Sequence, residues 1–274
     1  MAMNLNCKGR LLMLDSPIVM GILNVTPDSF FDGGEHDSLT NALEQTQKMV
    51  DEGATIIDVG GMSSRPGAEI ISSEEEIRRV VPVIQEISNA FPDVFISLDT
   101  LHSAVANEGV QAGANIINDI SGGNYDSKIW DVCIENDVPY ILMHMQGEPN
   151  TMQHNPQYEN VTLEILSFLK NRVHHLHSKG LKDIVIDPGF GFGKTVDQNF
   201  ELLNKLGVFQ ILDLPILVGV SRKSMINKVL GTNPDSALNG TTAVHMLALE
   251  RGANILRVHD VKEAVQCIKI YEKL

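Results

Sequence analysis

The stretch VFISLDTLHSAVANEGVQAGANIINDI, residues 94–120, decides the fold. Two short apolar runs, Val94–Leu98 and Asn115–Asn118, stand on either side of a longer amphipathic segment. The centres of the two runs, Ile96 and Ile116, are 20 residues apart. A crossover between parallel strands needs about a dozen residues or more, so this spacing leaves room for a helix. The stretch therefore predicts one strand–helix–strand unit of a parallel sheet.

The same unit recurs along the whole chain. The apolar runs are continuous rather than alternating, which is typical of parallel strands that are covered on both faces. Eight runs are found: Ile18–Leu23, Thr55–Val59, Val94–Leu98, Asn115–Asn118, Pro139–Met143, Ile184–Ile186, Ile216–Val220 and Asn254–Val258. We therefore expect eight parallel strands.

Helical patterns lie between the predicted strands. Residues 40–53 place their apolar side chains on one face and end at Gly53, a suitable C-cap. Ser73 with Glu76 three residues on has the spacing of a capping box, so we expect a helix to begin there. Asp260 is expected to open the last helix.

Eight such units predict closure into a (β/α)8 barrel. The chain has 274 residues, which suits one barrel of about 250 residues, so residues 1–274 are expected to form a single domain. The alternative is an open, doubly wound sheet. Polar residues follow nearly every predicted strand, and this favours the barrel.

The composition argues against some classes of binding partner and indicates a cellular compartment. A net charge of −14 argues against nucleic acid and anionic lipid as partners. Cys7, Cys133 and Cys267 are odd in number and far apart, which fits reduced thiols in the cytoplasm. The first ten residues lack the apolar core of a signal peptide, and no run is long enough to span a bilayer. We expect a cytoplasmic enzyme.

Polar and glycine-rich segments collect where the predicted strands end, and in a barrel these points meet at one mouth. The residues concerned are Asn24, Gly60–Gly67, Asp99, Asn118–Asp119, His144, Asp187–Lys194, Ser221–Ser224 and Arg257–Asp260. The segment Asp187–Lys194, DPGFGFGK, is not a phosphate-binding P-loop, because Pro188 takes the place of the first glycine. Its glycines are expected to allow a tight turn between strand and helix.

The residues of this mouth suggest two layers. Asp99, Asn118 and Asp187 offer acceptors to the N–H groups of a flat heterocycle, and Lys223 would serve acceptors on its opposite edge. Such carboxylates are costly to bury unless they are paired.

An outer, cationic layer is expected from Arg65, Arg257 and His259, which suits a phosphate or pyrophosphate. Asn24 is a neutral oxygen ligand suited to Mg²⁺. The structural alternatives are that Asp99 and Asp187 are strand-end caps, that Asn24 caps a turn, that Arg65 is a solvated loop residue, and that Arg257 forms a salt bridge at the barrel rim. His174, His175 and His177 are interpreted as surface residues of a helix.

Seven motifs stand in the order found in one enzyme family. They are MGILNVTPDSFFDGG, DVGGMSSRPGA, SLDT, INDISGG, DPGFGFGK, GVSRKSM and RVHD, spread from Met20 to about His259. The chain resembles dihydropteroate synthase. The resemblance implies a cytoplasmic, homodimeric transferase of folate biosynthesis with a (β/α)8 barrel, which joins dihydropterin-CH₂-pyrophosphate to p-aminobenzoate, releases pyrophosphate and is a sulfonamide target.

The resemblance also implies roles for individual residues. Asp99, Asn118, Asp187 and Lys223 would hold the pterin; Arg65, Arg257 and His259 the pyrophosphate; Ser64, Arg65, Pro66, Phe190 and Ser224 the p-aminobenzoate; and Asn24 the Mg²⁺. Asp99, Lys223 and Arg257 would be catalytic. Of Phe190 and Phe192, Phe190 is expected to be the exposed one.

The chain departs from the family pattern in its second loop, where Met62 and Ser64 stand in place of the Glu and Thr of many members. Two other functions are alternatives. One is a pterin-binding methyltransferase of the corrinoid type, and the other is a pterin-binding module without catalysis.

Overall fold

A computed structural model describes residues 3–26, 34–63, 67–147, 152 and 156–274. Its main sheet has eight strands in the order β8-β7-β6-β5-β4-β3-β10-β9, and every paired neighbour is parallel. The strands are β3 (Ile18–Asn24), β4 (Ile56–Gly60), β5 (Phe95–Asp99), β6 (Ile116–Asp119), β7 (Tyr140–Met143), β8 (Ile184–Asp187), β9 (Leu217–Val218) and β10 (Ile255–Val258).

The sheet closes on itself between β8 and β9. A single parallel bridge joins Ile186 to Ile216, and the Ile186 N–H donates to the Pro215 carbonyl at 2.9 Å. The eight-stranded barrel predicted from the sequence is therefore confirmed, and the open sheet is excluded. The last two strands are shorter than expected: β9 keeps only two residues, and its ladder to β10 ends at Val218.

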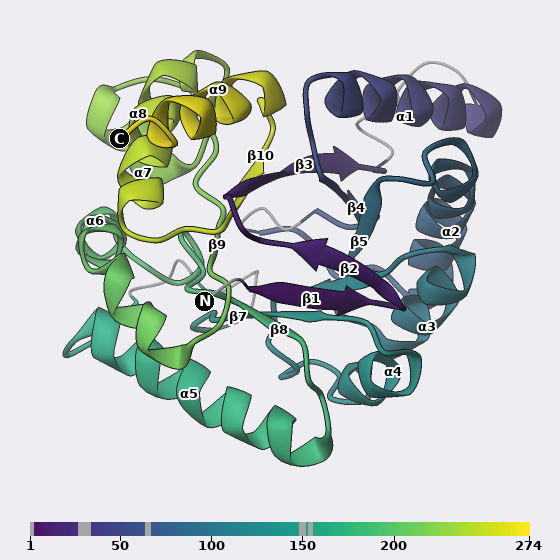
Figure 1. The fold of residues 1–274 in the computed structure, drawn as a ribbon, viewed down its shortest axis with the longest axis horizontal. Helices are drawn as coiled ribbons and strands as arrows, with labels where there is room; N and C mark the ends of the chain where they lie inside the picture. Colours follow the sequence, from purple (N-terminus) through teal and green to yellow (C-terminus); the bar gives the residue numbers. More distant parts are fainter. Residues whose placement is uncertain (1–2, 27–33, 64–66, 148–151, 153–155) are drawn as a thin grey trace.

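Helices surround the barrel (Figure 1). They are α1 (Gly34–Asp51), α2 (Ser73–Ala90), α3 (Ser103–Ala112), α4 (Ile129–Asn136), α5 (Val161–Lys179), α6 (Val196–Asn204), α7 (Ser224–Leu230), α8 (Leu238–Glu250) and α9 (Val261–Tyr271), with short 3-10 turns at Leu206–Leu212 and Pro234–Ser236. A continuous apolar core of Val, Ile, Leu and Ala side chains fills the space between strands and helices. None of the helices in the described part of the chain is both long and apolar enough to cross a bilayer.

Helix α2 begins at Ser73 as predicted, but the capping of α2 and α9 needs correction. The N-cap of α2 is Ser72, whose Oγ accepts from the Glu75 N–H at 3.3 Å, so the expected capping box of Ser73 and Glu76 is wrong. Glu76 instead points inward and is fully buried. Asp260 does precede α9, but its side chain makes no cap bond and pairs with Arg222.

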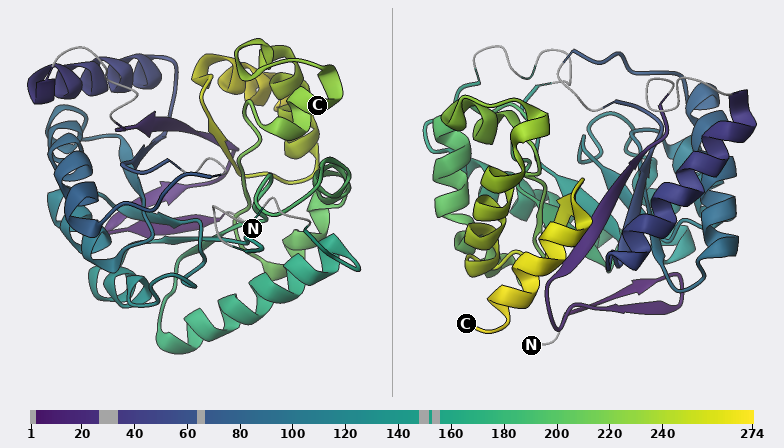
Figure 2. Two further views of the ribbon diagram at one scale, coloured as in Figure 1. Left: turned by 180° about the vertical axis from the view of Figure 1, so that it is seen from behind. Right: turned by 90° about the horizontal axis from the view of Figure 1, so that it is seen from above.

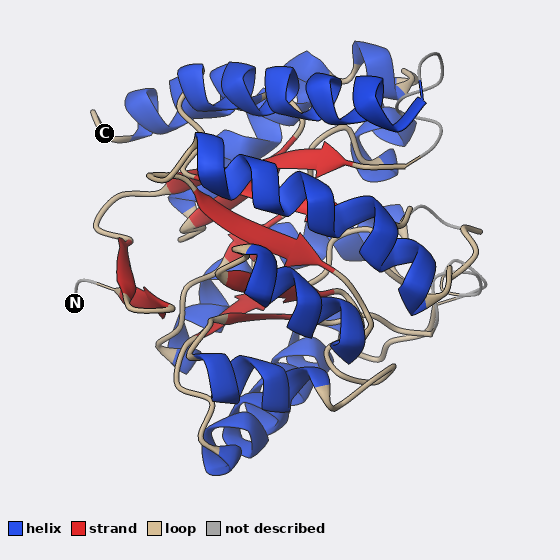
Figure 3. Ribbon diagram, turned by 90° about the vertical axis from the view of Figure 1, so that its right-hand side faces the viewer, coloured by secondary structure: helices blue, strands red, loops and turns tan. Residues whose placement is uncertain are grey.

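An N-terminal hairpin, which the sequence analysis did not predict, closes the amino end of the barrel. Strands β1 (Asn4–Cys7) and β2 (Arg10–Met13) are joined by Lys8 and Gly9, whose φ values of 56° and 88° are those of a tight hairpin turn. Figure 3 shows the hairpin at the end where the strands begin, away from the arrowheads, and Figure 2 shows both termini at this same end.

The hairpin packs on a ring of side chains from the barrel interior. Its buried residues form one cluster with a single apolar residue from each barrel strand: Met20, Ile56, Phe95, Ile116, Ile141, Val185, Leu217 and Ile255. Alternate residues of a strand face the same side, so the residues two positions further along each strand also face the interior, one layer nearer the carboxyl ends. That second layer contains Asp58, Asn118, Asp187 and Arg257 of the candidate site, and Asp99 lies two positions further along β5.

Candidate active site

The centre of the barrel holds a hydrogen-bonded cluster of Asp58, Asp99, Asn118 and Arg257, from β4, β5, β6 and β10. The Arg257 Nε donates to Asp58 Oδ2 at 2.6 Å, and its Nη2 donates to Asp99 Oδ2 at 2.7 Å. Asn118 Nδ2 lies 3.3 Å from Asp58 Oδ2. One guanidinium thus joins two carboxylates contributed by neighbouring strands.

The charges of this cluster are strongly coupled. The pKa of Asp99 is raised to about 7, mainly by burial. The nearby Asp58 also raises this pKa, and Arg257 lowers it. Burial alone would lower the pKa of Arg257, but Asp58 and Asp99 hold it well above its ordinary value. Arg257 therefore stays charged, and burial keeps the pKa of Asp99 above its ordinary value although Arg257 is its partner.

This cluster corrects the two-layer expectation for Arg257. Its side chain is only 18% exposed and lies among the acids, not in an outer cationic layer. Asp58, which is fully buried, was missed by the sequence analysis. The available signal was a charged residue inside the buried run Ile56–Gly60, two positions after the inward-facing Ile56.

Asp187 and Lys223 lie on the other side of the same interior space. Burial raises the pKa of Asp187, and the charges of Lys223, Lys194 and Arg257 oppose that rise, so these three cations are each within electrostatic reach of Asp187. The pKa of Lys223 is lowered to about 8, mainly by burial. The charge of Arg257 also lowers this pKa, whereas Asp187 and Asp99 raise it. The predicted set Asp99, Asn118, Asp187, Lys223 and Arg257 therefore does meet in one place.

The glycine-rich loop after β8 positions Lys223. Gly189, Gly191 and Gly193 all have positive φ, as a tight turn requires. The Gly189 N–H donates to Asp187 Oδ1 at 2.7 Å. Lys223 Nζ donates to the Phe190 carbonyl oxygen and lies 4.4 Å from the centre of the Phe192 ring.

The two phenylalanines of this loop differ from expectation. Phe190 has no exposed surface and belongs to the core between strands and helices, so the expectation that it is the exposed one is wrong. Phe192 belongs to a small apolar cluster at the mouth, with Leu101, Ile120, Met143 and Met152. Met62, the departure from the family pattern, packs against this cluster.

Lys194 is, after Asp58, a second buried charged residue near the site that the sequence analysis did not single out. It is 3% exposed, and its Nζ donates to the carbonyls of Gly189 and Phe192 at 2.7 and 2.9 Å. Its Nζ also lies 3.3 Å from His144 Nδ1. Burial lowers the pKa of Lys194 to about 7. Lys194 therefore ties the glycine-rich loop to the end of β7.

The rim of the barrel carries the remaining predicted residues. Ser221 Oγ lies 3.1 Å from His259 Nδ1 and accepts from the His259 N–H at 3.2 Å. Ser224 is the first residue of α7 and is exposed. Asn24, the last residue of β3, is also exposed and pairs in register with Gly60. Ser64, Arg65 and Pro66 lie outside the described residues.

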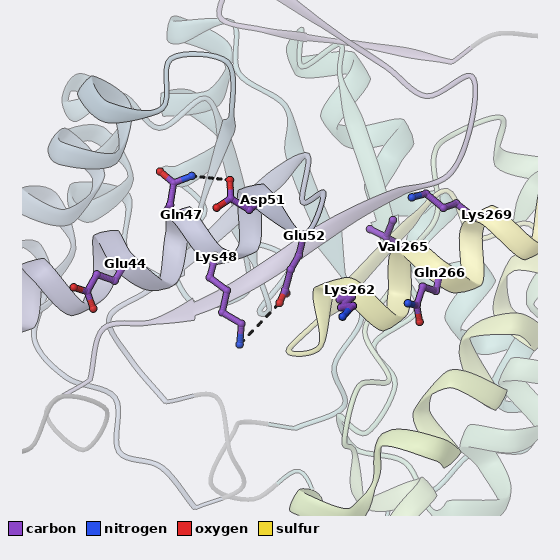
Figure 4. Close-up of a pocket in the computed structure, with 9 residues that line it drawn as sticks. All are labelled: Glu44, Gln47, Lys48, Asp51, Glu52, Lys262, Val265, Gln266 and Lys269. Carbon is purple, nitrogen blue, oxygen red and sulfur yellow. Dashed lines mark hydrogen bonds and ion pairs between the residues drawn. The ribbon is translucent and has the colours of Figure 1, made fainter.

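Two hollows lie beside the barrel among the described residues. A cavity of about 170 Å³ lies next to Ser224, between the starts of α6 and α7, and Lys194, Thr195 and Lys228 line part of it. A larger, open groove of about 630 Å³ runs between α1 and α9 on the outside (Figure 4). Lysine and carboxylate side chains of both helices line that groove, which lies away from the cluster of Asp58 and Arg257.

A buried set of acids, an amide, a lysine and an arginine at the carboxyl ends of a (β/α)8 barrel defines a site for a small polar heterocycle. The family described as pterin binding enzyme matches residues 20–259. The chain belongs to this family, and the relatives described below are dihydropteroate synthases.

Two comparisons of sequence illustrate this. The chain is 45% identical over 272 residues to dihydropteroate synthase of Escherichia coli strain K12, with 98% of this chain and 96% of the relative covered. It is 44% identical to the enzyme of Haemophilus influenzae, with 98% of each chain covered.

Solved structures agree. The Yersinia pestis dihydropteroate synthase, described with a sulfonamide drug complex, has a TM-score of 0.93 and 44% identity, with 99% of this chain and 98% of that chain covered. The Xanthomonas albilineans enzyme with 4-aminobenzoic acid has a TM-score of 0.93 and 39% identity, with 100% of this chain and 98% of that chain covered.

Proposed function

We propose that this chain is a dihydropteroate synthase. It condenses 6-hydroxymethyl-7,8-dihydropterin pyrophosphate with p-aminobenzoate and releases 7,8-dihydropteroate and pyrophosphate. The observation that carries this assignment is the meeting of Asp58, Asp99, Asn118, Asp187, Lys223 and Arg257 in one buried space. The relatives described above match over nearly the full length and are enzymes of this name. Because the Yersinia pestis enzyme is described with a sulfonamide drug complex, we propose sulfonamides as ligands of this chain as well.

The pterin ring would lie between the two halves of the interior site. Asp99, Asn118 and Asp187 offer oxygen acceptors to the N–H donors of the ring, and Lys223 offers a donor to its acceptors. Charge-assisted hydrogen bonds of this kind contribute about 1.5–3 kcal/mol each. Arg257 would then contact the ring region from its position between Asp58 and Asp99, while also facing the pyrophosphate.

The pyrophosphate would lie at the rim, toward His259, Arg257 and the second loop that carries Arg65. No group of three or more His, Cys, Asp or Glu suited to a metal occurs among the described residues. Asn24 is exposed at the end of β3 and offers one neutral oxygen, which fits a Mg²⁺ held mainly by waters and phosphate oxygens. When bound there, Mg²⁺ would neutralise charge on the leaving pyrophosphate.

The protein's own groups account for the rest of the reaction. A dissociative path separates pyrophosphate from the pterin methylene before the aryl amine attacks, and it places positive charge on the pterin. The carboxylate of Asp99 stabilises that charge, and Arg257 and His259 stabilise the departing anion. Ser64, Arg65, Pro66 and Ser224 would form the p-aminobenzoate site.

The organisation of the protein is proposed on the same basis. Residues 1–274 form a single pterin-binding domain, two copies form a homodimer, and the enzyme works in the cytoplasm on small molecules, without nucleic acid or membrane partners. Light scattering coupled to size-exclusion chromatography tests the dimer: a mass equal to one chain at micromolar concentration contradicts it.

The activity is tested by pyrophosphate release from purified protein. Release that requires both p-aminobenzoate and Mg²⁺, with dihydropteroate as the second product, supports the assignment. Tight pterin binding without such release supports the methyltransferase or a non-catalytic module. Growth of a folate auxotroph carrying the gene separates those two from the synthase.

A further inference from the structure

Arg222 stands between two residues of the site, Ser221 and Lys223, and its backbone has a positive φ of 56°. Residues other than glycine rarely adopt this conformation, and where they do, the surrounding contacts must hold it. The Arg222 N–H donates to Thr241 Oγ1 at 3.1 Å, and Asn227 Nδ2 donates to the Arg222 carbonyl at 3.0 Å. Both partners are buried, so α7 and α8 fix the backbone of Arg222.

The side chain of Arg222 reaches the neighbouring loop. Its Nε and Nη2 donate to the two carboxylate oxygens of Asp260 at 2.9 and 2.6 Å. Asp260 directly follows His259, and its side chain serves this pair instead of capping α9. Hydrogen bonding to Arg222 lowers the pKa of Asp260, so the carboxylate stays charged at neutral pH.

The main-chain pairing between the strands that lead into these two loops is short. The β9–β10 ladder has only two paired positions, Ile255 with Leu217 and Leu256 with Val218, and it ends before the site residues begin. Beyond it, the Ser221–His259 hydrogen bonds and the Arg222–Asp260 ion pair join the loops. The Arg222–Asp260 ion pair thus joins the two loops beyond the last paired position of the main-chain ladder.

We propose that Arg222 and Asp260 are positioning residues, whose ion pair holds Lys223 and His259 at a set separation. This rests on the proposed function, in which Lys223 binds the pterin ring and His259 binds the pyrophosphate. A substrate that joins both groups needs both sites at the correct spacing. A fragment that uses only one site does not.

Three ligands distinguish positioning from direct binding. In calorimetry, Asp260→Asn and Arg222→Lys should bind 6-hydroxymethylpterin and, with Mg²⁺, inorganic pyrophosphate within about twofold of wild type. The joined pterin pyrophosphate should bind at least tenfold more weakly, and kcat should fall by about 10²-fold, the effect of a misplacement near 1 Å. Asp260→Glu, which keeps the carboxylate, should recover part of the loss.

The control removes a comparable ion pair outside the site. Glu201→Gln breaks the pair of Glu201 with Lys205 at 2.8 Å on α6, where both side chains are over 40% exposed. It should leave all three affinities and kcat unchanged. Far-ultraviolet circular dichroism establishes that each variant is folded.

Two results would overturn the positioning role. Equal loss of affinity for pyrophosphate alone and for the joined substrate would mean that the pair acts directly on the phosphate. Unchanged affinity and kcat in both Asp260→Asn and Arg222→Lys would mean that the pair has no role. Failure of the proposed function is a separate outcome, because the wild-type protein itself would then not bind or turn over the joined substrate.

Discussion

Asp58 and Arg257 are 199 residues apart in the chain, yet the Arg257 Nε lies 2.6 Å from Asp58 Oδ2 inside the barrel. The same guanidinium reaches Asp99 at 2.7 Å. One positive charge is therefore shared by two buried carboxylates. This arrangement offers a heterocycle a site whose charges are already oriented before it binds.

Asp58→Asn should damage both stability and activity. It keeps the shape of the side chain but leaves Arg257 with only Asp99 as a charged partner. Breaking a buried ion pair typically costs about 3–5 kcal/mol, so the free energy of unfolding in urea should fall by a few kcal/mol. Pterin affinity should fall too, because Arg257 loses an ion-pair partner and Asn118 loses a charged hydrogen-bond acceptor. A wild-type urea midpoint in Asp58→Asn would contradict this role.

Asp187→Asn should weaken pterin binding while leaving the fold intact. Its Oδ1 accepts from the Gly189 N–H, a bond that the amide oxygen of Asn can still accept. The lost charge removes a charge-assisted bond to the ring, worth about 1.5–3 kcal/mol, or roughly 10- to 100-fold in affinity. Calorimetry with a pterin checks this. Equal affinities for wild type and Asp187→Asn would remove Asp187 from the pterin site.

Lys223→Ala should impair the use of both substrates. Its Nζ bonds the Phe190 carbonyl and lies over the Phe192 ring, so its loss affects the glycine-rich loop as well as the pterin contact. We expect kcat/KM for each substrate to drop by at least about tenfold, the equivalent of one hydrogen bond to a charged group. Lys205→Ala, on the exposed end of α6, is the control. Normal turnover by Lys223→Ala would exclude it from the site.

Glu76→Gln should change how stability depends on pH. Burial raises the pKa of Glu76 to about 7, which its hydrogen bond from Thr100 and the charge of Arg79 only partly offset. The folded state therefore holds this proton more tightly than the unfolded state, whose pKa is near the ordinary 4.5. The resulting stabilisation is complete below pH 4.5 and is lost as pH rises through 7.

Gln cannot ionise, so the stability of Glu76→Gln should exceed that of the wild type by a margin that grows between about pH 5 and 7 and levels off above pH 7. The slope is at most about 1.4 kcal/mol per pH unit for one proton. Urea unfolding at pH 5, 6, 7 and 8 measures it, with Glu201→Gln as the control. Parallel stability curves for wild type and Glu76→Gln would show that Glu76 titrates normally.

Removal of Mg²⁺ should slow pyrophosphate release. Asn24 is the protein ligand proposed for the ion, so Asn24→Ala should raise the Mg²⁺ concentration needed for half-maximal rate. The pterin affinity of that variant should not change, because Asn24 lies at the rim of the barrel. Kinetics that do not depend on the metal would refute the assignment of Asn24.

The sequence by itself determined the architecture and the place of the site. Continuous apolar runs mark strands wherever they occur, since a strand covered on both faces must be apolar along its length. The carboxyl ends of parallel strands meet at one mouth, so the sequence predicts that polar residues such as Asn118, Asp187 and Lys223 come together.

Only the tertiary structure decided which of these groups pair. Asn118 and Asp119 are adjacent, yet Asn118 bonds Asp58 in the interior, while Asp119 accepts from Tyr140 and from the loop after β6. Which one faces inward depends on the register of β6, and the partners of Arg257 depend on the order of strands around the barrel. These pairings join residues up to 199 positions apart. Local patterns carry no information on such contacts, because closure of the barrel brings them about.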